Sequence, residues 1–127
     1  MNIFDKLGVG VTIGSIVEVL TQHADLMNVL CVFMLLDFIT GYAKGFINHN
    51  LSSEASLCGI IKKILIICVC VMAHEVALIS DSDAVELLVL YFFIANEGLS
   101  ILENSGACGV PIPSRLSRAL EQLKGDD

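Results

Sequence analysis

Three long apolar runs limit what this chain can fold into. They cover residues 26–43, 60–79 and 85–102, and the first reads LMNVLCVFMLLDFITGYA. Each is close to the ~20 residues that an α-helix needs to cross a bilayer core. Hydrophobic residues make up 55% of the chain, and a soluble domain of this size would leave about a third of its surface facing water. The sequence therefore predicts an all-α integral membrane protein, residues 1–127, with three transmembrane helices in a single membrane domain.

The N-terminal segment, residues 3–22, is apolar but interrupted by polar residues. Those expected to share one helical face are Thr12, Ser15 and Glu18. Gly10 and Gly14 form a GxxxG pattern on another side, which permits close helix packing in membranes. We expect this segment either to be a fourth membrane helix or to lie flat on the membrane as an amphipathic helix. A cleaved signal peptide is not expected, because no small-residue cleavage site follows.

The charges between the spans predict their orientation. Residues 44–63 carry three lysines against Glu54, whereas the turn after the second span carries Asp81 and Asp83 and no basic residue. Loops rich in lysine and arginine stay in the cytoplasm. The lysine-rich loop is therefore expected on the cytoplasmic side, and the C-terminus, two crossings later, on the same side. Three or four crossings remain open, because the N-terminal segment could cross or lie flat.

A short amphipathic helix is expected at the C-terminus, over residues 114–124. Pro111 and Pro113 end the preceding helix, because proline disfavours helical geometry in the residue before it. Ser114 is the expected N-cap. Leucines recur at helical spacing among Arg115, Arg118 and other charged residues. This helix is expected to rest on the cytoplasmic membrane surface or to pair with neighbours.

Two predicted spans carry polar residues along one face. In the first span these are Asp37, Thr40, Gly41 and Lys44, and in the third they include Asn96, Glu97 and Ser100. Charged groups are costly in hydrocarbon, so these faces should meet water, protein or headgroups. One interpretation is that they line an oligomeric pore or contact other helices, with Gly41 allowing close packing. The other is that headgroups and helix ends satisfy them, and Asp37 could pair with Lys44 or with another helix.

No motif of an enzyme, metal site or cofactor site is recognised. His74 and Glu75 begin HEVAL, which lacks the second histidine of a zinc-protease HExxH motif. The five cysteines are an odd number, mostly in apolar runs, and are interpreted as reduced. The formal net charge of −7 argues against a nucleic-acid partner. We therefore expect no enzymatic activity and no cofactor.

Several motifs together resemble the phage-lysis and toxin-secretion holin family of Gram-positive bacteria and their phages. In order they are DFITG (37–41), LSSE (51–54), GIIKK (59–63), ANEGLSILEN (95–104), GVPIP (109–113) and LEQLK (120–124). The resemblance covers roughly residues 35–124 and is weakest in the N-terminal third. It implies a multi-pass protein of the bacterial cytoplasmic membrane. Such a holin would oligomerise and form non-selective pores that release an endolysin for host lysis or export a toxin.

The implied partners are membrane lipid, other copies of the chain, and an endolysin or exported toxin, and the resemblance also allows an antiholin. The expected mechanism is that copies hide the Thr12, Ser15 and Glu18 face, or the Asp37 face, against each other and turn it toward a lumen on assembly. Two alternatives stay open. The chain could be a small multidrug-type transporter or ion channel, with Glu18 or Asp37 binding a cation, or a non-conducting membrane adaptor that recruits a partner through its C-terminal helix.

Overall fold

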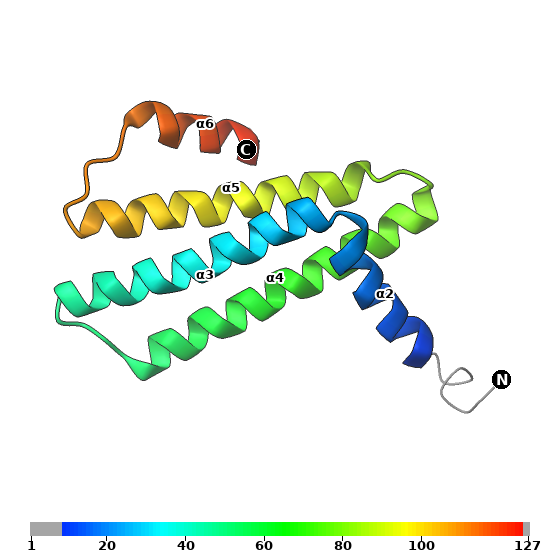
Figure 1. The fold of residues 1–127 in the computed structure, drawn as a ribbon, viewed down its shortest axis with the longest axis horizontal. Coiled ribbons are helices and arrows are strands. Elements are labelled where there is room, and N and C mark those ends of the chain that lie inside the picture. The colour runs from blue at the N-terminus through cyan, green and yellow to red at the C-terminus, as the bar shows by residue number, and fades with distance from the viewer. Residues whose placement is uncertain (1–8, 126–127) are drawn as a thin grey trace.

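The computed structural model describes residues 9–125, with side chains undescribed for 9–12, 15 and 19. All regular structure in this range is helical, as predicted. Its helices are α2 (Val9–Gln22), α3 (Ala24–Ile47), α4 (Ser53–Ser80), α5 (Ala84–Ala107) and α6 (Ser114–Lys124) (Figure 1). Helices α3, α4 and α5 are each long and apolar enough to cross a membrane. They extend past the apolar runs seen in the sequence, because helical backbone hydrogen bonds continue into the polar residues at each end.

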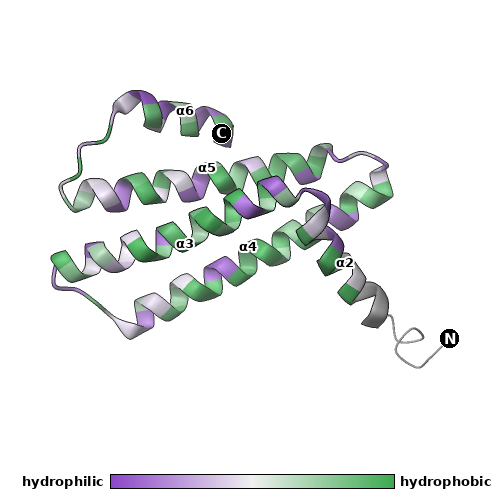
Figure 2. Ribbon diagram, viewed as in Figure 1, coloured by the Kyte–Doolittle hydropathy of each residue, from purple (hydrophilic) through white to green (hydrophobic). Residues whose placement is uncertain are grey.

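Helices α3, α4 and α5 lie side by side and run alternately in opposite directions along the chain (Figure 1). Helix α5 is central, because α3 and α4 both pack more extensively on it than on each other. A small core joins the three helices, formed by Met27, Leu30, Met34, Cys70, Leu90 and Ile94. Their outward faces remain hydrophobic, with Leu35, Ile64 and Leu88 each more than half exposed (Figure 2). Such apolar outer surfaces are suited to contact with lipid.

Local signals fix both ends of α4. The side chain of Ser52 caps its start by accepting a 3.2 Å hydrogen bond from the backbone N–H of Ala55. Asp81 ends the helix in the left-handed conformation, with φ of 53°. The cap at Ser52 places the lysines at 62 and 63 well inside the helix.

The two shorter helices lie outside the three-helix unit. Helix α2 crosses α4 near the end that carries the α4–α5 turn, whereas α6 folds back along α5 (Figure 1). The described part of α2 has 14 residues, about 21 Å at 1.5 Å per residue. Residues 3–8 of the predicted N-terminal segment lie outside the described residues.

The start of α6 differs from the expected cap. Ser114 is the first helical residue, Pro113 precedes it in an extended conformation, and no side chain caps the helix. The prediction that Ser114 is the N-cap was therefore wrong by one position. The ring of Pro113 sets its φ at −64°, a value that is already helical.

Candidate functional site

Lys63 joins three membrane helices through two ion pairs. Its ammonium group on α4 lies 2.6 Å from a carboxylate oxygen of Asp37 on α3 and 2.9 Å from one of Glu97 on α5. The Glu97 side chain is only 5% exposed, and the other two side chains are each 18% exposed. The cationic group therefore stands between two acids that would otherwise repel each other. We call these residues, with the two described next, the Lys63 cluster.

Asn104 and Thr40 extend this cluster by hydrogen bonds. The amide of Asn104 donates to a carboxylate oxygen of Asp37 at 3.0 Å and to the hydroxyl oxygen of Thr40 at 3.1 Å. The hydroxyl of Thr40 donates to the Leu36 carbonyl oxygen, one helical turn back, at 2.8 Å. The carboxylate of Asp37 is thus held from two neighbouring helices. Its charge is satisfied within one chain.

The Lys63 cluster lines an open cavity of about 560 Å³. The cavity lies between α3 and α4 toward the loop that joins them, and residues of α5 form its third side. Asn96 and Ser100 of α5 also line it, as do Glu103 and Lys62. This cavity is mixed in character, with enough polar groups to hold water beside the ion pairs.

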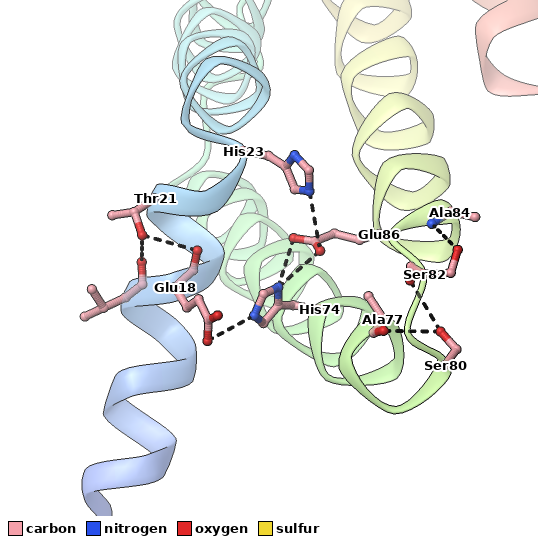
Figure 3. Close-up of polar contacts among 10 residues, drawn as sticks. Glu18, Thr21, His23, His74, Ala77, Ser80, Ser82, Ala84 and Glu86 are labelled. Carbon is pink, nitrogen blue, oxygen red and sulfur yellow. Dashed lines mark hydrogen bonds and ion pairs between the residues drawn. The ribbon is translucent and has the colours of Figure 1, made fainter.

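A second polar cluster lies near the opposite end of the unit (Figure 3). His74 of α4 is fully buried, and its Nδ1 atom is 3.1 Å from both carboxylate oxygens of Glu86 on α5. Its Nε2 atom lies 3.4 Å from Glu18 of α2, and Nε2 of His23 lies 3.7 Å from Glu86. We call these four residues the His74 cluster. It ties α2 to the three-helix unit.

An apolar layer separates the two clusters. Lys63 and His74 are eleven residues apart on α4, about 16 Å along the helix axis at 1.5 Å per residue. Leu30, Cys70 and Leu90 are among the core residues, each at most 1% exposed. The unit therefore has polar groups toward both ends and a dry middle. Within the described residues, no group of three or more potential ligand side chains is arranged to hold a metal ion.

The structure brings together some of the residues singled out in the sequence. Asp37, Thr40 and Glu97 belong to the Lys63 cluster, and Asn96 and Ser100 line its cavity. Asp37 therefore pairs with another helix. The alternative partner, Lys44, forms no ion pair with a described residue, because it lies two turns away on the same helix.

The remaining singled-out residues lie elsewhere. Glu18 is half exposed and approaches His74 from α2. Gly41 lies against the cluster, since a Cβ atom there would be 3.6 Å from the Asn104 amide nitrogen. Gly14 has no described atom within 4 Å of its Cβ position. Gly10 and the side chains of Thr12 and Ser15 lie outside what the structure describes.

Sequence reasoning missed Lys63, His74 and Glu86 as partners. Lys63 was placed at the cytoplasmic start of the second span, whereas the Ser-Ser-Glu pattern at 52–54 would have indicated that the helix begins earlier and that Lys63 lies well inside it. His74 lies six residues before the end of α4 at Ser80, and Glu86 lies two residues after the start of α5 at Ala84. Both are within about two helical turns of the α4–α5 turn, and this common position at one end of the hairpin was the available signal for pairing them.

A family model and a phage relative identify one family for this chain. The model described as "Bacteriophage holin family" matches residues 14–125. A "Probable holin" of Bacillus phage phi105 is 35% identical over 107 residues, covering 84% of this chain and 77% of the phage protein. An uncharacterised 14.9 kDa protein of Clostridium perfringens is 46% identical over 96 residues, covering 74% and 73% of the two chains. The uncharacterised Listeria innocua protein Lin0175 is 34% identical, covering 94% of this chain and 86% of its own length. No solved structure matches the chain.

Proposed function

The chain belongs to the bacteriophage holin family, and from this premise we propose that it oligomerises in the bacterial cytoplasmic membrane and opens non-selective holes. Through such holes an endolysin would reach the cell wall for host lysis, or a toxin would leave the cell. Three helices able to cross a membrane make it a multi-pass membrane protein. The holin family is not an enzyme family, in keeping with the expectation of no catalysis.

One observation carries this proposal beyond family membership: the charges of the Lys63 cluster are paired inside the chain. Lys63 pairs with both Asp37 and Glu97 between the helices, while the outer faces of α3, α4 and α5 are apolar. A single copy can therefore reside in lipid, since no charge of the Lys63 cluster has to meet the hydrocarbon. A protein of this kind can accumulate without damaging the membrane.

Assembly would change what surrounds this cluster. The 560 Å³ cavity opens between α3 and α4, and in a ring of copies it would fill with water continuous with the lumen. Asp37, Thr40, Lys44, Asn96, Glu97 and Ser100 are the pore-lining or inter-helix residues of this proposal. Water in the cavity would then solvate both carboxylates, which favours the assembled state. We do not assign a lining role to Glu18, since it already approaches His74.

For topology we propose three crossings, with the α3–α4 loop and the C-terminus in the cytoplasm. The excess of basic residues near these segments supports this orientation. The described part of α2 crosses α4 at an angle and does not run alongside the three-helix unit. Helix α2 would then lie at the outer surface, where it contacts the His74 cluster.

The test is release of a folded cytoplasmic enzyme from bacteria that express the chain. We expect the enzyme to appear in the medium. Large uncharged dextrans, added outside as reporters of hole size, should enter the cells. A small transporter would dissipate ion gradients without passing protein, and an adaptor would do neither. Absence of release, with membrane insertion verified by fractionation, would refute the holin function.

A further inference from the structure

Helix α6 is packed along α5 rather than extending away from it (Figure 1). Leu120 sits on Gly98, where its Cδ1 atom is 3.1 Å from the position a Cβ would take. The ammonium group of Lys124 lies 5.7 Å from the ring centroid of Phe92, a cation–π contact. The linker between the helices turns back at Gly109, whose φ is +94°.

These contacts lie deep along α5. At 1.5 Å per residue, Gly98 is about 13 Å and Phe92 about 22 Å from the end of α5 at Ala107. The hydrocarbon core of a bilayer is about 30 Å thick and α5 about 36 Å long. When α5 crosses the membrane, the contact between Lys124 and Phe92 therefore lies beyond the middle of the helix.

The outward side of the docked α6 is charged. Arg115, Arg118 and Glu121 are exposed, and no residue of α6 is buried. Leu116 and Leu123 also remain about half exposed, so the contact with α5 covers only part of the apolar face. Charged side chains at this depth are costly in lipid and tolerated where they meet water. The docked position thus requires water on the outward side of α6.

We infer that α6 docks on α5 in the wall of the water-filled hole and lines it with Arg115 and Arg118, while Lys124 holds the helix to α5 through Phe92. This inference rests on the proposed holin function and deepens it by naming lining residues. Before assembly, α6 lies on the cytoplasmic membrane surface, as amphipathic helices with basic residues do. Docking replaces its contact with lipid headgroups by contact with Gly98 and Phe92, and places the two arginines in the lumen.

The test crosslinks α6 in its docked position. In a full-length variant whose five cysteines are replaced by serine or alanine, Phe92→Cys and Lys124→Cys are introduced together. The protein is reconstituted into liposomes holding a fluorescent dextran and treated with a short bifunctional thiol reagent. Each single cysteine variant, treated in the same way, is the matched control. We expect the crosslink to form in the membrane and dextran release to continue at no less than half the control rate.

Three results would overturn the inference. Crosslinking that slows release tenfold or more, with recovery on cleavage of the reagent, would make the docked form the closed one. Absence of any crosslink in liposomes that do leak would mean that α6 does not dock in the hole. Absence of leakage from the wild-type chain would instead refute the holin function, and the inference with it.

A second measurement uses the outward face of α6. Arg118→Cys in the same background should react with a bulky charged methanethiosulfonate during conduction, and the current across a planar bilayer should fall by at least half. Leu88→Cys, 67% exposed on the hydrophobic outer face of α5, is the control and should leave the current unchanged. Equal effects at the two positions would contradict lumen lining by α6.

Discussion

Replacing Lys63 with methionine gives the most direct test of the polar cluster between the spans. The substitution keeps the length of the side chain and removes its charge. It leaves Asp37 and Glu97, which sit 2.6 and 2.9 Å from the lost ammonium group, facing each other without a cation. Removal of one partner from a buried ion pair costs about 3–5 kcal/mol. Since Lys63 and Asp37 are 18% exposed, solvent screening lowers our expected loss to about 2–3 kcal/mol.

A loss of this size reduces the ratio of folded to unfolded protein about 30- to 150-fold, at about 1.4 kcal/mol per factor of ten. The measurement is unfolding of the purified protein in detergent micelles with increasing denaturing detergent, followed by helical circular dichroism. Lys62→Met is the matched control, because Lys62 is exposed and forms no ion pair with a described residue. Its expected effect is within about 0.5 kcal/mol.

Neutralising the acids should restore stability if repulsion between them is the cause. The triple variant Lys63→Met, Asp37→Asn and Glu97→Gln should therefore recover at least half of the loss. Equal stability of Lys63→Met and Lys62→Met would refute the reasoning. So would a triple variant less stable than Lys63→Met alone, since the uncompensated charges would then not be the source of the loss.

Three further predictions concern other parts of the molecule. His74→Leu should lower the free energy of unfolding by about 3 kcal/mol, because it leaves the 2% exposed Glu86 with only a 3.7 Å contact to His23. Glu18→Gln, at a half-exposed side chain, should lower it by under about 1 kcal/mol. The same unfolding assay checks both variants, and equal losses would contradict the geometry of the His74 cluster. Asn104→Leu should lower the free energy of unfolding by about 1–2 kcal/mol, because its hydrogen bonds to Asp37 and Thr40 are lost. The control Asn96→Leu should lower it by less, and a larger loss in the control would argue against a stabilising role of Asn104. In the cysteine-free background, Asn50→Cys should react with an impermeant maleimide only from the cytoplasmic side and Ser82→Cys only from outside; labelling of both from one side would exclude the proposed topology.

The sequence was sufficient for the all-α membrane fold, because the apolar runs are long and each carries few charges. It was also sufficient to single out Asp37 and Glu97, since acids are rare within such runs. Their partner could not be predicted, because a position in a helix does not reveal which neighbouring helix supplies the opposite charge. Lys63 shows the difficulty: the same lysine that indicates a cytoplasmic loop by charge lies inside α4 and points between the helices.

The position of α6 was equally beyond sequence reasoning. Its alternating leucines and charges predict an amphipathic helix and are compatible with a lipid surface or a protein face. The choice between them depends on Gly98, which leaves room for Leu120 at the α5 surface. Residues 114–124 alone do not indicate that α5 has room for Leu120 at Gly98.

The limited contact between α3 and α4 has a consequence for membrane shape. The two helices diverge toward the loop that joins them, around the 560 Å³ cavity, while both stay packed on α5 (Figure 1). The three-helix unit is therefore wider toward the α3–α4 loop than toward the α4–α5 turn. Units of this shape placed side by side would meet at an angle and would bend the bilayer around them, where parallel-sided units would form a flat raft.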